Sequence, residues 1–175
     1  TRRLYWTDIE SSELLALEES NDAVMRWSLP ERLGSFALTD RSHILLMGLE
    51  SRLALYDLNT GFLSTIAASP GGSDTRIGDG RCDRSSNFVF GTMDDGFPAK
   101  VIGKFHRLNA ATLTVETLAL PDVAIPNSIC FSPDGGTLYY CDSMQGRIMC
   151  CDYPSLQNQR VFTTIEGEGA PDGSC

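Results

Sequence analysis

The sequence of 175 residues lacks the marks of several common protein classes. Its longest apolar runs, residues 44–47 and 123–125, are far too short to cross a bilayer, and the amino end has no basic-then-apolar signal pattern. A Rossmann or kinase fold has no support, because neither G-x-G-x-x-G nor G-x-x-x-x-G-K-[ST] occurs. We expect a cytoplasmic protein that does not enter the membrane. The start at Thr1, without Met, suggests that the natural beginning of the chain is absent.

Positive charge is scarce in this chain. It has 14 Lys and Arg against 23 Asp and Glu, which gives a formal net charge of −9. Nucleic-acid binding is therefore not expected, because phosphates need patches of Lys and Arg that displace counterions. Cations or neutral polar ligands fit this balance better. A hydrophobic content of 42% with 21% charged residues is typical of a soluble globular protein.

Histidine is also scarce, and cysteine occurs without metal-site spacing. His43 and His106 are the only histidines, and both lie in strand patterns, so we expect structural roles and no His-based catalytic triad. None of the six cysteines falls in a C-x-x-C pair, and several lie in apolar strand patterns. We therefore expect reduced structural thiols rather than disulfides or zinc ligands. The cysteines are Cys82, Cys130, Cys141, Cys150, Cys151 and Cys175.

An internal repeat is the clearest signal of the fold. Three segments begin with a polar turn, at residues 39–42, 82–85 and 132–135, and each continues into a short apolar strand, a second turn and another strand. The turn aspartates Asp40, Asp83 and Asp134 are 43 and 51 residues apart, which suits four-stranded propeller blades with loop insertions. A partial copy starts at residues 4–6. Residues 11–20 are the best helical candidate, but we predict a strand with an acidic loop there.

The repeat predicts an all-β fold of the β-propeller type. Gly, Pro, Asn and Asp interrupt the chain every eight to twelve residues, and strands rich in Tyr, Phe, Val and Ile lie between them. The chain has room for roughly three to four blades. We expect residues 1–175 to form a single partial propeller domain that is truncated at both ends, since propellers normally close into a ring.

Three polar loops between the predicted blades are candidates for a binding site. They span residues 76–83, 125–135 and 170–173. Taken alone, each has a simpler interpretation, because Asp-Gly is a common turn dipeptide and Arg76 could be a solvated charge. For Asp134 we expect only a turn. The side chain of Asn127 could equally serve only to form hydrogen bonds with the backbone of a buried loop.

In combination the motifs resemble those of the regucalcin and gluconolactonase family of sugar lactonases. The agreement covers nearly the whole chain, in both order and spacing. The matching motifs are Tyr5-Trp6-x-Asp8-Ile9, Gly34-Ser35-Phe36-Ala37-Leu38, Arg76-x-x-Asp79-Gly80-x-x-Asp83, Phe90-Gly91-Thr92-Met93, Pro126-Asn127-Ser128, Thr137-Leu138-Tyr139-Tyr140-x-Asp142-Ser143 and Pro171-Asp172-Gly173.

The resemblance implies a six-bladed propeller with one divalent cation, Ca²⁺, Zn²⁺, Mn²⁺ or Mg²⁺, held by a Glu, an Asn and an Asp. The Asn matches Asn127 and the Asp matches Asp172. The Glu would precede Leu4 and is not in this chain. The family's substrate-side Arg matches Arg76, and its neighbouring Asp matches Asp79.

The implied activity is hydrolysis of a sugar lactone to the sugar acid, with Asp172 as cation ligand and general base, and with Arg76 and Asp79 binding the substrate. The full-length protein is expected to be a monomer, and this segment alone to be part of a lactonase rather than a working one. One departure leaves substrate choice open: Gly78 stands where the family usually has Asn. The alternatives are a calcium-binding propeller without turnover, or a hydrolase of another ester such as an organophosphate.

Overall fold

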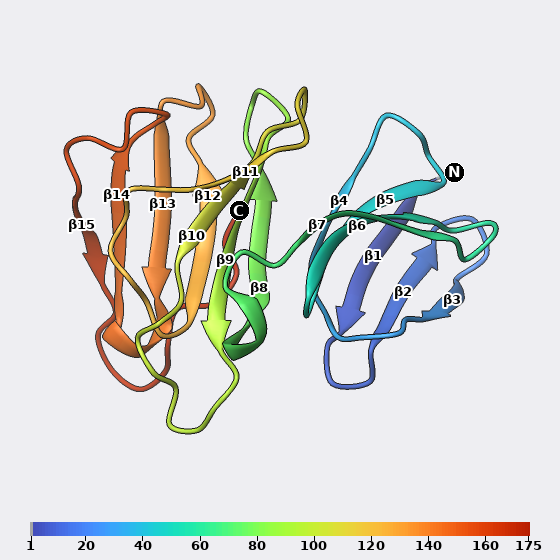
Figure 1. Ribbon diagram of the computed structural model, residues 1–175, viewed down its shortest axis with the longest axis horizontal. Coiled ribbons are helices and arrows are strands. Elements are labelled where there is room, and N and C mark those ends of the chain that lie inside the picture. Colours follow the sequence, from blue (N-terminus) through green and yellow to red (C-terminus); the bar gives the residue numbers. More distant parts are fainter. Residues whose placement is uncertain (1) are drawn as a thin grey trace.

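The computed structural model describes residues 2–175, and within them the chain forms four antiparallel sheets (Figure 1). The first sheet has three strands and each of the others has four. The strands are β1 (Arg3–Asp8), β2 (Glu13–Glu18), β3 (Ala23–Ser28), β4 (Leu33–Leu38), β5 (Ile44–Leu49), β6 (Arg52–Asp57), β7 (Leu63–Ala68), β8 (Thr75–Cys82), β9 (Phe88–Asp94), β10 (Phe105–Leu108), β11 (Val115–Thr117), β12 (Pro126–Phe131), β13 (Thr137–Asp142), β14 (Arg147–Asp152) and β15 (Arg160–Thr164). Two short 3₁₀ helices are η1 (Gly72–Asp74) and η2 (Ser143–Gln145). The expectation of an all-β propeller type, with roughly three to four blades in this chain, is confirmed.

Each sheet is built from strands that follow one another in sequence and pair as antiparallel neighbours. The repeated polar turns connect the first and second strands of the three four-stranded sheets. In two of these turns an aspartate side chain closes the bend: Asp83 Oδ1 accepts from the backbone N–H of Ser85 and Asn87, at 2.8 Å each, and Asp134 Oδ1 accepts from Gly136 at 3.0 Å. Aspartate is favoured in such turns because its short carboxylate can bond backbone two residues on.

Two local expectations had different outcomes. The acidic segment at residues 11–20 does contain a strand, β2, whose Leu14 and Ala16 are buried. His43, which we expected in a strand, instead lies in the turn just before β5, where its carbonyl accepts from the backbone N–H of Leu58. His106 does lie in a strand, β10, and is buried. A turn position at His43 follows from the run of polar residues before it, which favours a bend over a strand.

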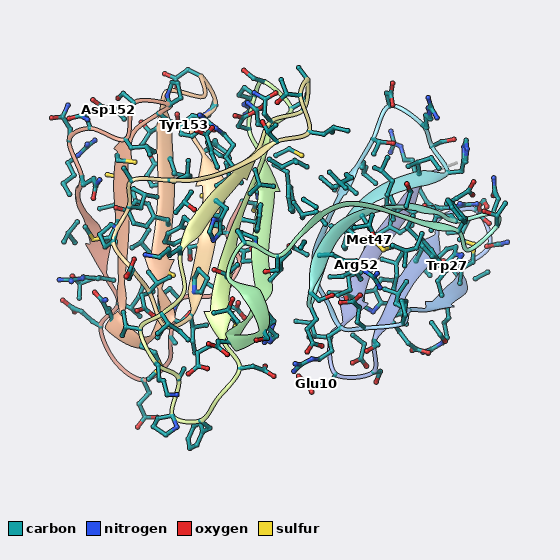
Figure 2. The ribbon with its side chains drawn as sticks, viewed as in Figure 1. Glu10, Trp27, Met47, Arg52, Asp152 and Tyr153 are labelled. Carbon is teal, nitrogen blue, oxygen red and sulfur yellow. The ribbon has the colours of Figure 1, made fainter. Side chains whose placement is uncertain are left out.

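The hydrophobic core lies between successive sheets, in three clusters. The cluster between the first and second sheets contains Met47, and Trp27 packs against this cluster (both residues are labelled in Figure 2). The indole N–H of Trp27 donates to the carbonyl of Leu58 at 3.0 Å. Each fully buried Leu, Met or Phe contributes about 1.5–3 kcal/mol to folding. Fully buried members of the other two clusters include Ile77, Phe90, Phe105 and Leu138.

The first strands of the three four-stranded sheets, β4, β8 and β12, lie side by side and form one wall. The approach of β4 to β8 is close: a Cβ on Gly34 would come within 2.2 Å of the Ile77 carbonyl oxygen, so only glycine fits. Ser35 Oγ also donates to the Gly78 carbonyl at 2.7 Å. Candidate-site residues lie on β8 and β12, so these contacts set their relative positions.

Within residues 2–175 the structure holds no helix of the length and apolar character that crossing a membrane requires. All six cysteines are free thiols. Cys141, Cys150 and Cys151 are buried within the fourth sheet, where they pack as small hydrophobic residues.

Candidate functional site

The candidate site is a cavity of about 230 Å³ at one end of the wall formed by β4, β8 and β12. Arg76 and Asp79 reach it from β8, Asn127 from β12, and Asp172 from the segment that follows β15. The four side chains named by the sequence motifs therefore meet in one place, although they lie as much as 96 residues apart in the chain. The rest of the lining is Ile9, Gly34, Gly78, Met93, Ile125, Pro126 and Gly173.

Irregular pairing marks both strands at the site. One extra residue is inserted in β8 between Ile77 and Gly80, and one in β12 between Asn127 and Cys130. Ser128, inside the second bulge, has a φ of 57°, a left-handed conformation that is uncommon for serine. A bulge bends its strand and turns a side chain away from the regular alternation. The two bulges thus set the direction of the side chains beside them.

Asn127 is held by a chain of hydrogen bonds that settles which way its amide points. Its Nδ2 donates to Ser143 Oγ at 2.9 Å, and Ser143 Oγ donates to the Pro171 carbonyl at 2.7 Å. A hydroxyl has one hydrogen, and here it goes to a carbonyl, which can only accept. Ser143 must therefore accept from Asn127, and the amide oxygen of Asn127 has no hydrogen-bond partner among residues 2–175.

Asp172 belongs to a segment without regular secondary structure that is attached to β12. Its backbone carbonyl accepts from Ser128 Oγ at 2.6 Å, and the preceding Pro171 is buried. The Asp172 side chain is exposed, and within the described part of the chain its carboxylate makes no hydrogen bond or ion pair. The backbone is anchored while the carboxylate stays available to a ligand.

Asp79 lines the cavity, but its carboxylate also joins two strands. Oδ1 accepts from the N–H of Gly80 at 2.8 Å, and Oδ2 accepts from the N–H of Ile129 at 3.0 Å, across from β8 to β12. Burial raises the pKa of Asp79, the two backbone N–H groups oppose that shift, and the negative charge of Asp172 adds to it. An ionised carboxylate accepts about four hydrogen bonds, so lone pairs remain for a ligand.

Arg76 is restrained by an ion pair that the sequence motifs did not indicate. Its Nε donates to Asp95 Oδ1 at 2.9 Å, and only 13% of its side chain is exposed. Asp95 also binds Arg32, whose Nε pairs with Glu50 at 3.0 Å. The hydrogen bond from Arg32 lowers the pKa of Asp95, and Arg76 lowers it further. The network holds the Arg76 guanidinium against the wall of the cavity.

Sequence reasoning did not identify Ser128, Ser143 or Asp95 as parts of this site. Ser128 and Ser143 belong to the matching motifs, directly after Asn127 and Asp142, but no role was assigned to either residue. Asp95 directly follows the end of β9, and a carboxylate at the end of a strand was the one feature that could have indicated it from the sequence. Its two guanidinium partners could not be assigned, because Arg32 lies 63 residues away in the chain.

The balance of charge at the cavity favours a cation. Arg76 is already paired with Asp95, whereas the carboxylate of Asp172 has no partner among residues 2–175 and lies near enough to Asp79 to raise its pKa. No group of three or more His, Cys, Asp and Glu within residues 2–175 is close enough to hold a metal ion. The oxygen donors that face the cavity freely are those of Asn127 and Asp172.

Fold and site together define a β-propeller with an oxygen-lined cavity at one end of its innermost strands. The sequence profile of the family described as SMP-30/Gluconolactonase/LRE-like region matches residues 1–175, and the chain belongs to this family.

Individual relatives agree with the family. The chain is 46% identical over 179 residues to the L-arabinolactonase of Azospirillum brasilense, covering 99% of this chain and 59% of that protein. It is 30% identical to the 6-deoxy-6-sulfogluconolactonase of Pseudomonas putida, covering 98% and 60%. The crystal structure of a calcium-binding protein, regucalcin, from Agrobacterium tumefaciens superimposes with a TM-score of 0.87 at 29% identity, over 98% of this chain and 59% of that one. The chain thus spans about three fifths of the length of these relatives.

Proposed function

We propose that the protein to which this chain belongs hydrolyses a sugar lactone to the corresponding sugar acid with the help of a divalent cation. The observation that carries the proposal is the cavity shared by Arg76, Asp79, Asn127 and Asp172. The 46% identity to an L-arabinolactonase and the 30% identity to a 6-deoxy-6-sulfogluconolactonase support a five- or six-carbon aldonolactone as the substrate class.

The residues at the cavity fit a cation. Asn127 offers an amide oxygen and Asp172 a carboxylate, and neither group is used by another residue in the described range. Amide and carboxylate oxygens suit Ca²⁺, Mg²⁺ and Mn²⁺, and Zn²⁺ also accepts them. A cation bound there would stabilise the negative charge that develops on the lactone carbonyl oxygen.

The chain's own residues account for the remaining chemistry. The free carboxylate of Asp172 accepts a proton from the water that attacks the lactone carbonyl carbon. The ring C–O bond then breaks, the leaving ring oxygen takes up the proton held by Asp172, and the product is the open hydroxy acid. The restrained guanidinium of Arg76 and the remaining lone pairs of Asp79 bind sugar hydroxyls, so that the carbonyl is held in line with the water.

The test uses the full-length protein. Asn127→Ala and Asp172→Ala are assayed for acid release from a panel of aldonolactones with added Ca²⁺, Mg²⁺, Mn²⁺ or Zn²⁺, and we expect at least a hundredfold loss of kcat/KM. Asp40→Ala is the matched control, because Asp40 is exposed and its side chain makes no hydrogen bond within residues 2–175. Undiminished hydrolysis in both site variants would refute the assignment of Asn127 and Asp172 to the site.

A calcium-binding propeller without turnover is the second candidate. It is favoured by the regucalcin structure, which is described as a calcium-binding protein. It predicts that Asn127→Ala and Asp172→Ala weaken Ca²⁺ binding in calorimetry while the unmodified protein hydrolyses no lactone of the panel. Measurable hydrolysis by the unmodified protein decides against it.

A further inference from the structure

Arg32 does not line the candidate cavity, but the turn between β5 and β6 holds it in one position. Its Nε donates to Glu50 Oε2 at 3.0 Å, and its backbone carbonyl accepts from the N–H of Glu50 at 2.8 Å. The preceding residue, Glu31, accepts from the N–H of Ser51 at 2.8 Å and forms an ion pair with Arg52. Both the backbone and the guanidinium of Arg32 are therefore anchored to the second sheet.

The terminal nitrogens of Arg32 bind both oxygens of Asp95, which belongs to the third sheet. Nη1 donates to Oδ1 at 3.1 Å and Nη2 to Oδ2 at 2.5 Å, so the pair forms two parallel bonds. The loop that carries Asp95 is closed by its neighbour Asp94, whose carboxylate accepts from the N–H of Gly96 at 3.1 Å and of Lys100 at 2.8 Å. A two-bond pair fixes the direction of a carboxylate as well as its distance.

The pairing with Arg32 limits what Asp95 can offer to Arg76. Two parallel bonds use the lone pairs that face the same way, one on each oxygen, and the two remaining lone pairs diverge. A second planar guanidinium can therefore reach only one of them. The structure shows this single bond, in which Arg76 Nε donates to Asp95 Oδ1 at 2.9 Å.

The terminal nitrogens of Arg76 are consequently left for a ligand. Nη1 has only a 3.4 Å contact with the carbonyl of Ile77, and Nη2 makes no hydrogen bond within residues 2–175. Without Arg32, the Asp95 carboxylate would be free to turn and take a terminal nitrogen as well, because an Arg–carboxylate pair is strongest with two bonds. Asp95 would then compete with a sugar hydroxyl for Arg76.

We propose that Arg32 is a positioning residue of the site, which keeps Asp95 from occupying the terminal nitrogens of Arg76 and so leaves them to the substrate. Neither Arg32 nor its partner Glu50 belongs to the sequence motifs that named the site. The effect of Arg32 on turnover rests on the proposed function, because it acts through the binding of sugar hydroxyls by Arg76. Its effect on the direction of the Asp95 carboxylate does not.

The first test is the steady-state kinetics of the full-length protein on the aldonolactone panel. Arg32→Met should raise KM about tenfold, because the substrate loses hydrogen bonds to a charged group, and this rise should exceed any fall in kcat. Arg32→Lys should have an intermediate KM, since an ammonium group lacks the planar pair of donors. A KM for Arg32→Met equal to that of the unmodified protein would overturn the proposal.

Arg107→Met is the matched control. The Arg107 side chain is 20% exposed, against 21% for Arg32, and it forms an ion pair with Glu116. It lies with Asp83 at the end of the strands opposite to the candidate cavity, so its loss should leave KM unchanged. An equal rise of KM in Arg107→Met would show that the loss of any such ion pair has this effect, and would count against the positioning role of Arg32.

A second substitution distinguishes competition by Asp95 from a general loss of ion pairs. Asp95→Ala in the Arg32→Met protein removes the competing carboxylate, so KM should fall about threefold or more relative to Arg32→Met alone. A purely structural role of the ion pairs predicts the opposite, because the second loss would add to the first. A double variant with a KM equal to or above that of Arg32→Met would refute the competition.

The crystal structure of full-length Arg32→Met gives a result that does not depend on turnover. We expect an Asp95 carboxylate oxygen at hydrogen-bond distance, about 2.7–3.2 Å, from Nη1 or Nη2 of Arg76. An Asp95 that keeps only its single bond to Nε would overturn the proposal, whatever the KM. Should the Met variant not fold, Arg32→Lys is read in the same way. If the unmodified protein hydrolyses no lactone, the proposed function fails, and this structure still decides whether Arg32 directs Asp95.

Discussion

Ser143 should determine how tightly the site holds its cation, although it is not placed to touch one. Its hydroxyl accepts from the amide of Asn127 and donates to the carbonyl of Pro171, next to Asp172. Ser143→Ala removes both hydrogen bonds at a half-buried position. The Asn127 amide can then rotate by half a turn, which exchanges its oxygen for a donor N–H group at the cavity.

The size of the effect follows from the two bonds. Each contributes about 0.5–1.5 kcal/mol net, and the bond to Asn127 acts directly on the ligand orientation. A loss of about 1 kcal/mol in cation affinity corresponds to roughly fivefold weaker binding, and the loss of both bonds extends this to about tenfold or more. Global stability should fall by about 1–3 kcal/mol, because the Pro171 carbonyl also loses its donor.

Calorimetric titration of the full-length protein with Ca²⁺ or Mn²⁺ measures the affinity, and urea unfolding measures the stability. Ser143→Thr keeps the hydroxyl and should recover most of the affinity. Equal affinity in Ser143→Ala and the unmodified protein would refute the reasoning. So would an equal loss in the Ala and Thr variants, since that result points to packing rather than to the hydrogen bonds.

Three further predictions concern single positions. Asp79→Asn should cost about 1–3 kcal/mol in urea unfolding, because an amide offers one acceptor to the N–H groups of Gly80 and Ile129, which need two; unchanged stability would contradict the bridging role. Burial lowers the pKa of His106 to about 4, below its ordinary value of 6.5. As the pH falls, the unfolded chain therefore binds a proton at this residue before the folded chain does. The free energy of unfolding should fall by roughly 2–3 kcal/mol as the pH drops from about 6.5 towards 4. His106→Gln should flatten that pH dependence, and an identical slope in the variant would count against it. Gly78→Asn should change stability by less than about 1 kcal/mol, since a Cβ there meets Met93 Sδ at 3.5 Å, Met93 Cγ at 3.9 Å and the Gly91 carbonyl oxygen at 4.0 Å, all ordinary contacts. The variant should alter relative KM values across a lactone panel, and identical KM values would show that the position does not face substrate.

Much of the fold could be predicted because its signals are local. The turns at Asp83 and Asp134 are closed by hydrogen bonds within four residues, so they depend on little besides neighbouring sequence. The strand over the acidic segment was predicted by its short apolar run between turn residues. His43 was placed wrongly because the strand pattern that begins at Ile44 was extended by one residue into the polar turn before it.

The residues of the candidate site could be predicted from the sequence, but their contacts could not. Arg76, Asp79, Asn127 and Asp172 were named by the resemblance of the motifs to those of a known family, and the structure brings them to one cavity. Their catalytic and ligand roles stay predictions. Their actual partners could not be predicted, since the bond from Ile129 to Asp79 joins residues 50 positions apart.

The sequence by itself determined the succession of turns and strands, the blade repeat, and the identity of the polar residues at the strand ends. These depend on backbone preference and on the alternation of apolar residues over a few positions. Only the tertiary structure decided that Asp79 joins β8 to β12, that Asp95 restrains Arg76, and that Ser143 orients Asn127. The physical reason is that adjacent blades meet through their innermost strands, where one-residue bulges turn side chains toward partners that no local pattern specifies.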